Sequence, residues 1–300
     1  MHLRLSDRGF VLMLLAPAAT FMLVLVAYPL ADLVRNSFFN GTLAAPDAGQ
    51  FVGLDNYAKA IASPQFGGAA FRTVLYTLIV VPSELVLGIA AALLFNALGA
   101  RSAIFRTVFA FPLMIAPLVA GLLWKFLLSD NFGVVNWILY WVGILHSPTS
   151  VSWLSDPNLV LFAVAIPDVW LTTSFVALVV YAGLQSIPED IIEAARIDGA
   201  AYLQRLRYIT LPLLRPVIAV VLVIRGVDAA KTFDVIWLQT QGGPDFASEV
   251  LSLQIYRTTI RFGDLGQGAA IATMFLLALM AVSIVTILRV WRPGEGARNA

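Results

Sequence analysis

Four charged residues recur at intervals of three along an otherwise apolar stretch: Arg225, Asp228, Lys231 and Asp234. On a helix, residues three apart are neighbours on one face, so these alternating charges can pair with one another. Arginine and carboxylate groups can also offer paired hydrogen bonds to a ligand rich in hydroxyl groups. A charge inside a membrane costs about 2.5–3.5 kcal/mol on insertion scales and usually faces a cavity or a partner. The pattern therefore leaves both mutual neutralisation and ligand binding open.

Single charges interrupt three other apolar stretches, at Glu84, Lys125 and Asp168. Glu84 and Lys125 could pair between helices, and we interpret both as structural. Asp168 is a candidate for contact with a polar ligand. The chain has no cysteine and two histidines, which lie far apart in the sequence, so we expect neither a metal site nor a thiol nucleophile. The sequence also shows no pairing of a nucleophile with a base that would indicate catalytic residues.

The composition decides the class of protein. Of the 300 residues, 60% are apolar and 12% are charged, against roughly 45–50% and roughly 25% in soluble domains. A soluble fold of this size could not hide so much apolar surface. The net charge of +1 argues against a nucleic-acid binder that relies on bulk positive charge. The chain is therefore predicted to be an integral membrane protein.

A helix that crosses the hydrocarbon core needs about 20 mostly apolar residues. Six runs meet this criterion: 10–31, 74–98, 108–128, 159–184, 217–238 and 269–288. We therefore predict an all-α membrane protein with six transmembrane helices in one domain, residues 1–300. The first run follows Arg4 and Arg8 as in a signal peptide, but it continues past the candidate cleavage site, which favours a retained anchor helix.

The placement of basic residues predicts the orientation of these helices, because Lys and Arg gather in cytoplasmic segments. With the N-terminus inside, most of the arginines lie inside. The outer segments then hold Arg35, Lys59, Arg72, Arg257 and Arg261. The stretch 130–157, predicted to be an outer loop, carries neither Lys nor Arg. Both termini are therefore predicted to be cytoplasmic.

The longest polar cytoplasmic segment contains a predicted helical hairpin, residues 186–210. Ser186 and Glu189 have the spacing of a capping box, and Pro188 suits the first turn of a helix. Asp198-Gly199 is predicted to end this helix, because glycine adopts the left-handed conformation at low cost. A second short helix over 200–208 is then expected to lead into the fifth span.

The same hairpin carries a family motif. It contains Glu193-Ala194-Ala195, Gly199, Ile209 and Leu211-Pro212, in the pattern E-A-A-x3-G-x9-I-x-L-P. This pattern resembles the "EAA" coupling loop of ABC importer permeases. Three other segments resemble the carbohydrate branch of that family, and its maltose-type F-like subunit in particular: 51–57 (FVGLDNY), 168–175 (DVWLTTSF) and 233–244, with F-D followed by T-Q-G-G-P. The resemblance covers essentially the whole chain.

The resemblance implies a type I importer permease in the inner membrane of a bacterium. Such a chain works with a second permease, two ATPase subunits and an extracytoplasmic sugar-binding protein. Glu193, Ala194, Ala195 and Gly199 would then couple the membrane helices to the ATPases. The sequence has no G-x4-G-K-[ST] phosphate loop. We therefore expect no enzyme activity and no cofactor on this chain, with ATP and magnesium held by the partners.

The resemblance also implies where the sugar binds. Carried over by position, its contacts fall on two spans: Asp168, Leu171, Thr172 and Phe175 on the earlier one, and Arg225, Asp228, Ala229 and Thr232 on the later one. The charged pair Arg225–Asp228 departs from the neutral lining of maltose-type subunits. It resembles trehalose-type and other oligosaccharide members more, so the expected substrate is trehalose or another disaccharide. A polyol such as a glycerol phosphodiester stays open.

A transporter driven by protons or sodium ions is the main alternative. In that case Asp168 or the charges from Arg225 to Asp234 would act as a relay. The hairpin motif and the lack of a clear inverted repeat argue against it. Uptake that survives an uncoupler but stops when ATP is depleted would favour the ATP-driven importer.

Overall fold

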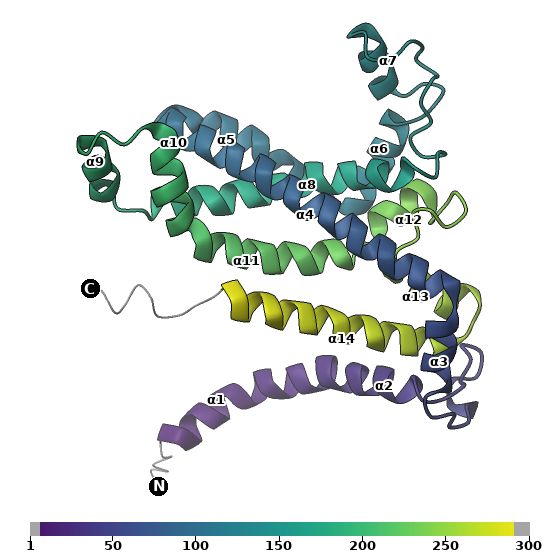
Figure 1. Cartoon of the computed structure of the whole chain (residues 1–300). Coiled ribbons are helices and arrows are strands. Elements are labelled where there is room, and N and C mark those ends of the chain that lie inside the picture. Colours follow the sequence, from purple (N-terminus) through teal and green to yellow (C-terminus); the bar gives the residue numbers. More distant parts are fainter. Residues whose placement is uncertain (1–6, 291–300) are drawn as a thin grey trace. The chain divides into compact units, whose positions relative to one another are not determined.

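The computed structural model describes residues 7–290, which form helices joined by loops and a few isolated bridges (Figure 1). Five helical stretches in this part of the chain are long and apolar enough to cross a membrane. They are Met13–Asn36, Pro64–Met114, Val160–Gln185, Tyr202–Thr240 and Leu265–Leu288. The prediction of an all-α membrane protein is confirmed.

The apolar run 108–128 differs from the single continuous helix that we expected. It consists of the end of α5 (Ser102–Ala110), a 3-10 turn (Phe111–Met114) and α6 (Pro117–Leu127). Ile115 and Ala116 are extended between the two helices. Pro117 explains the break, because the residue before a proline is driven away from the helical conformation. With 11 residues, α6 is about 16 Å long, which is shorter than the hydrocarbon core.

The contacts of the described chain divide it into two compact units. One unit runs up to Phe66 and includes Ile255–Leu277, and the other comprises Gly67–Gln254 with the residues from Ala278 onward. The first is called the terminal unit and the second the central unit. The remaining elements are α7 (Val134–Trp141), α12 (Asp234–Thr240), α13 (Leu251–Tyr256), a π-helical turn (Arg257–Arg261), α14 (Leu265–Val290) and 3-10 turns at Pro46–Ala48 and Gly99–Arg101.

In the terminal unit, α1 (Asp7–Met22) continues through a π-helical turn (Leu23–Ala27) into α2 (Tyr28–Asn36), and α3 (Asp55–Ala62) follows a loop. The buried Asn56 side chain donates hydrogen bonds to the carbonyl oxygens of Ser37 and Phe39, each at 2.9 Å. The Ser37 hydroxyl also lies 2.5 Å from the Tyr57 hydroxyl. Asn56 and Tyr57 of the 51–57 motif therefore hold in place the segment that follows α2.

The surface of α3 carries an ion pair of ordinary exposed type. Lys59 Nζ lies 2.7 Å from Asp55 Oδ2, one helical turn away. The hydrogen bond that the Lys59 ammonium donates to Asp55, with the negative charge of this carboxylate, raises the pKa of Lys59 above its usual value. Because both side chains remain largely in solvent, this pair contributes little to stability.

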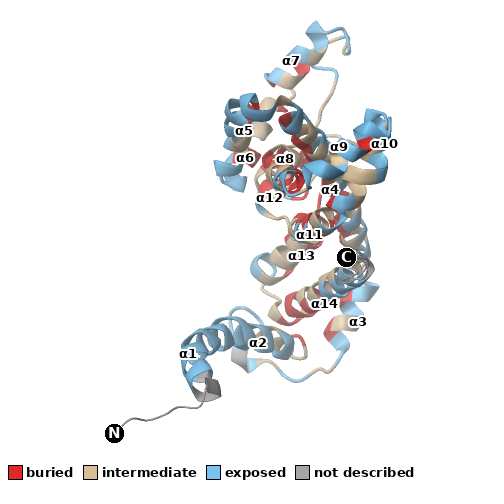
Figure 2. Ribbon diagram, turned by 90° about the vertical axis from the view of Figure 1, so that its left-hand side faces the viewer, coloured by how far each residue is buried: buried red, intermediate tan, exposed pale blue. Residues whose placement is uncertain are grey.

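In the central unit, α8 (Val160–Gln185) is the axis of the fold. It contacts α5, α6, α11 (Leu211–Ala230) and α12, and it lies beside α4 (Pro64–Leu98) and α11 in Figure 1. Figure 2 shows buried residues concentrated on α8, and apolar residues occur around the whole helix, as expected of a helix surrounded by others. Gly88 on α4 permits close approach, because a Cβ there would lie 2.6 Å from a methyl of Val176.

Candidate substrate site and coupling hairpin

The centre of the candidate site is an ion pair between α4 and α11. Arg225 Nε lies 2.8 Å from Glu84 Oε2, and Arg225 Nη2 lies 2.9 Å from Glu84 Oε1. The Glu84 side chain is 0% exposed and that of Arg225 is 6% exposed. A bidentate contact of this kind fixes the guanidinium plane as well as its position. The opposite charges of Glu84 and Arg225, which lie on separate helices, therefore neutralise each other in the interior of the central unit.

Asp168 on α8 completes the buried part of the site. Its Oδ1 lies 3.3 Å from Arg225 Nη2. Its Oδ2 accepts hydrogen bonds from the Tyr76 hydroxyl at 3.1 Å and from Thr232 Oγ1 at 3.2 Å. Helix α4, helix α11 and the segment after α11 thus each contribute a polar group to the carboxylate that α8 carries. We call Glu84, Asp168 and Arg225, with Tyr76, Thr172, Asp228 and Thr232, the arginine cluster.

Thr172 links the two carboxylates of the cluster. Its hydroxyl contacts Glu84 Oε1 and also lies 2.6 Å from the backbone oxygen of Asp168. A hydroxyl has one proton to donate. Thr172 can therefore serve only one of these acceptors at a time, and its rotation could accompany a change in the contacts of Glu84.

The cluster opens outward at Asp228. Its side chain is 40% exposed, lies 3.6 Å from Arg225 Nη1 and lies 2.9 Å from Lys231 Nζ. The Lys231 side chain is 59% exposed. Three carboxylates, from Glu84, Asp168 and Asp228, thus face two cations. The cluster therefore extends from a buried ion pair to partly exposed polar groups that a ligand can reach.

The prediction of four alternating charges along one helix is wrong at its last member. Helix α11 ends at Ala230, with Lys231 as its C-cap, and a new helix, α12, begins at Asp234. Asp234 is exposed and lies in the first turn of α12, where a carboxylate complements the positive end of the helix dipole. The charge pattern alone could not reveal this break, because the intervening Thr232 and Phe233 do not forbid a helix.

The structure brings together five of the eight predicted substrate residues: Asp168, Thr172, Arg225, Asp228 and Thr232. The other three are packed among apolar side chains. Ala229 is 1% exposed and belongs to the apolar core around Tyr76, and Phe175 packs against a second core that includes Val176. Leu171 is also buried, at 5% exposed.

Sequence reasoning missed Glu84 and Tyr76 as members of the site. Glu84 could have been suspected from its charge inside a span, whereas Tyr76 gives no such signal. The interpretation that Glu84 pairs with Lys125 is wrong, because Lys125 Nζ donates to the backbone oxygen of Leu238 at 3.1 Å. Arg225 satisfies Glu84 instead.

The predicted cytoplasmic hairpin is present, with a different start. Helix α9 spans Glu189–Ile197 with Pro188 as its N-cap, and Ser186 instead donates to the backbone oxygen of Gly183 at 2.8 Å. The capping-box prediction is therefore wrong, because Ser186 serves the end of α8. Gly199 has φ +79°, as the predicted turn requires.

The second arm of the hairpin is continuous with the fifth span. Helix α10 (Tyr202–Arg205) passes through a π-helical turn (Leu206–Thr210) into α11. In the motif, Ala195 is buried, whereas Glu193 and Ala194 are exposed. Because α11 carries Arg225, one helical rod joins the hairpin to the arginine cluster.

Among the residues that the structure describes, no group of three or more His, Cys, Asp or Glu side chains is arranged to hold a metal ion. The arginine cluster is therefore a set of charged and hydroxyl groups that can pair with each other or with a polar ligand.

Comparison with known proteins identifies the class. Residues 69–293 match the family of binding-protein-dependent transport system inner membrane components, and the chain belongs to this family. It is 37% identical to the sulfoquinovosyl glycerol transport system permease protein SmoG of Agrobacterium fabrum, over 94% of this chain and 91% of that protein. It is 35% identical to the trehalose/maltose transport system permease protein MalF of Thermococcus litoralis, over 94% and 93% of the two chains.

A solved structure shares the fold. A bacterial ABC transporter involved in the import of the acidic polysaccharide alginate contains a chain that matches with a TM-score of 0.82 and 24% identity. The match covers 96% of this chain and 98% of that one. The protein is therefore a multi-pass inner-membrane permease of the binding-protein-dependent ABC importers, and its relatives are permease subunits rather than enzymes.

Proposed function

We propose that this permease carries a sugar, trehalose or another disaccharide, and that the arginine cluster contacts the sugar during transport. The names of two relatives support the substrate class: SmoG belongs to a transport system for sulfoquinovosyl glycerol and MalF to one for trehalose and maltose. All three ligands carry sugar rings, whose hydroxyl groups both donate and accept hydrogen bonds.

The observation that carries the proposal is the gradation of the cluster from buried to accessible groups. Asp228 and Lys231 are partly exposed, whereas Arg225 and Asp168 lie behind them and hold each other. A sugar hydroxyl can first pair with the accessible carboxylate and ammonium. It can then take over hydrogen bonds of Thr232 and Arg225 as the helices move apart.

The order of these contacts has a physical reason. Glu84 and Asp168 engage Nε and Nη2 of the Arg225 guanidinium, so a sugar gains a hydrogen bond from these two nitrogens only when it replaces one of these partners. Glu84 makes two short contacts with Arg225, whereas Asp168 makes one longer contact with Arg225, at 3.3 Å. Asp168 is therefore the partner that we expect a sugar to displace.

The proposed partners follow from the class. A second permease would complete the membrane path, two ATPase subunits would bind and hydrolyse ATP with magnesium, and an outer binding protein would deliver the sugar. A related fold is known in a bacterial alginate ABC transporter, which was solved in complex with an alginate pentasaccharide-bound periplasmic protein. Glu193, Ala194, Ala195 and Gly199 would couple this chain to an ATPase through the rod of α10 and α11.

The test is to purify the tagged chain in mild detergent, identify the co-purifying proteins and reconstitute the complex. We expect a second permease, an ATPase and a binding protein, with ATP-dependent uptake of trehalose or maltose. A chain recovered alone that still transports these sugars in liposomes without ATP would overturn the proposal in favour of an ion-coupled transporter.

Variants of the same complex test the site. Asp228→Asn and Thr232→Val should each weaken uptake at low sugar concentration, because the first removes the negative charge and the second the hydroxyl of a group at the accessible side of the cluster. Asp234→Asn is the matched control, because Asp234 is a nearby exposed carboxylate on α12 outside the cluster. Equal uptake by all three variants and the parent would show that the cluster does not contact the sugar.

A further inference from the structure

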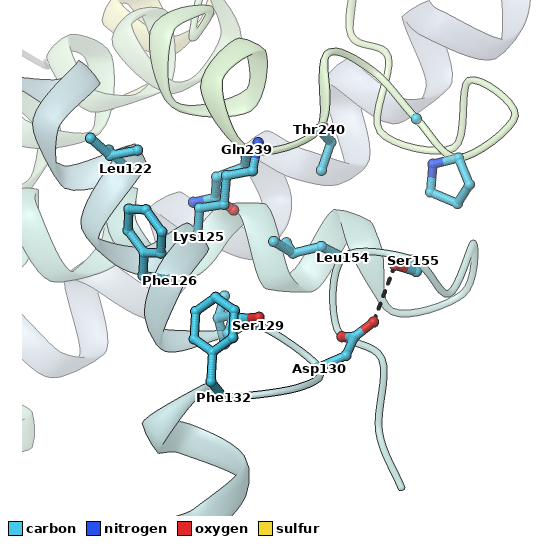
Figure 3. Close-up of a pocket in the computed structure, with 13 residues that line it drawn as sticks. Leu122, Lys125, Phe126, Ser129, Asp130, Phe132, Leu154, Ser155, Gln239 and Thr240 are labelled. Carbon is cyan, nitrogen blue, oxygen red and sulfur yellow. Dashed lines mark hydrogen bonds between the residues drawn. The ribbon is translucent and has the colours of Figure 1, made fainter. Parts of the chain in front are cut away.

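A second polar site lies in the central unit, apart from the arginine cluster. It is a pocket of about 610 Å³ formed by the end of α6, the turn after it, residues near Ser155 and the end of α12 (Figure 3). Its volume falls within the range of roughly 300–1,000 Å³ that small-molecule sites occupy. None of its lining residues belongs to the arginine cluster.

The feature that calls for a ligand is the side chain of Gln239. It is 3% exposed and lines the pocket. Among the described residues, neither its Nε2 nor its Oε1 has a hydrogen-bond partner. Buried polar groups are almost always satisfied, and an unpaired carboxamide carries a free-energy cost. Both amide atoms are covered in this structure, so a molecule in the pocket that both accepts and donates hydrogen bonds would remove this cost after a side-chain movement that exposes the amide to it.

The walls of the pocket are held in place without help from Gln239. On one side, the Ser248 hydroxyl donates to the backbone oxygen of Gly243 and lies 2.7 Å from Thr240 Oγ1, which fixes the loop after α12. On another side, the turn after α6 is tightly packed, because a Cβ on Gly133 would clash with the backbone oxygen of Ser129. The cavity is therefore a feature of the fold.

The remaining lining indicates the chemistry of the ligand. Lys125 and Asp130 supply one charge of each sign, and the hydroxyls of Ser129 and Ser155 add neutral polar groups. The rings of Phe126 and Phe132 lie with centroids 6.3 Å apart and offer apolar faces to a flat ligand. Balanced charge, hydroxyls, a carboxamide and aromatic faces together suit an uncharged, hydroxyl-rich ring better than an ion or a hydrocarbon.

We propose that this pocket is an outer subsite that binds a sugar ring through Gln239 before the sugar reaches the arginine cluster. Its position agrees with this role, because the loops 129–158 and 239–268 lie on the side that the distribution of Lys and Arg assigns to the outside. The inference rests on the proposed transport of a sugar and adds a second place at which this chain holds it.

The first experiment uses Gln239→Leu in the assembled complex. The variant replaces an unpaired buried amide by an apolar group of similar size, so the melting temperature should stay equal or rise. Uptake of trehalose or maltose at low concentration should nevertheless fall several-fold. Gln254→Leu is the matched control, because Gln254 is also buried and has an unpaired Oε1 but does not line the pocket. Unchanged uptake by Gln239→Leu would overturn the subsite.

The second experiment does not depend on transport. Because the chain has no native cysteine, Ser155→Cys introduces one thiol at the pocket, and Thr149→Cys introduces one in the same loop away from it. A membrane-impermeant maleimide is applied to the complex in liposomes without ATP. Millimolar trehalose or maltose should slow the labelling of Ser155→Cys several-fold and leave Thr149→Cys unchanged.

The protection should disappear when Gln239→Leu is added to Ser155→Cys. Lack of protection by both sugars in Ser155→Cys, or protection that survives Gln239→Leu, would overturn the inference. Protection in a complex that fails to take up either sugar would contradict the proposed transport function while it supports the subsite. Normal uptake without protection would do the opposite.

Discussion

Arg225 and Glu84, which are 141 residues apart, meet in a two-point contact of 2.8 and 2.9 Å in the interior of the central unit. The contact joins α4 to α11, and α11 continues from the cytoplasmic hairpin. A movement of the hairpin that shifts α11 along α4 must therefore either break this ion pair or move Glu84 together with Arg225. If the hairpin contacts an ATPase as proposed, this ion pair is expected to respond to its movement.

The ion pair itself can be tested by a double-mutant cycle. Glu84→Gln leaves the Arg225 charge buried with a weakened partner, and Arg225→Met leaves Glu84 unpaired. Breaking a buried pair from one side costs about 3–5 kcal/mol, so each single variant should lower the melting temperature of the purified complex and its amount in the membrane. The double variant Glu84→Gln/Arg225→Met should be more stable than the sum of the single effects predicts. Strict additivity would contradict the coupling of the two residues.

Tyr76 is expected to act through Asp168. The variant Tyr76→Phe keeps the ring in the apolar core but removes the hydrogen bond to Asp168 Oδ2. The loss should cost about 1 kcal/mol of stability. If Asp168 contacts the sugar, the concentration for half-maximal uptake should also rise, because the carboxylate is less firmly placed. Tyr181→Phe is the control, since Tyr181 packs against Phe95 outside the cluster. A change of stability with unaltered sugar dependence would limit Tyr76 to a structural role.

The turn at Gly199 is expected to be necessary for the proposed coupling role of the hairpin 186–210. Its φ of +79° disfavours any residue with a Cβ, although a Cβ would meet no atom within 4 Å. Gly199→Ala should therefore cost about 1–2 kcal/mol through backbone strain alone. Gly199→Asn should be milder, because asparagine tolerates the left-handed conformation better, and Gly199→Val should be the most severe. We expect sugar-stimulated ATP hydrolysis and uptake to fall in the order Gly, Asn, Ala, Val. Normal coupling in Gly199→Val would refute the role of this turn.

The hydrogen bonds of Asn56 are expected to stabilise the terminal unit. Asn56→Ala removes two hydrogen bonds and leaves the carbonyl oxygens of Ser37 and Phe39 without this donor. An unsatisfied buried group costs about 1–3 kcal/mol, so the variant should lower the melting temperature of the complex. Lys59→Ala on the same helix should leave it nearly unchanged, because that ion pair is largely exposed. Equal effects of the two substitutions would argue against the fastening role of Asn56.

The sequence by itself determined the class of the protein, most of its helices and the place of the hairpin turn. These features depend on local chemistry: long apolar runs, the paucity of charge and the conformational freedom of Gly199. The motif from Glu193 to Pro212 was sufficient to indicate the family, because its spacing is fixed by one short segment. Five of the eight expected substrate residues also came together, since four lie on α8 and α11, which pack side by side, and Thr232 follows α11 directly.

Only the tertiary structure decided which charges meet. Arg225 had Asp228 as its sequence neighbour, yet its short contacts are to Glu84, because packing of α4 against α8 and α11 brings that carboxylate to the guanidinium. The break between α11 and α12 and the isolation of Gln239 also depend on three-dimensional packing. Sequence spacing fixes neighbours along one helix, whereas contacts between helices depend on their rotation and depth, which arise when the whole bundle packs.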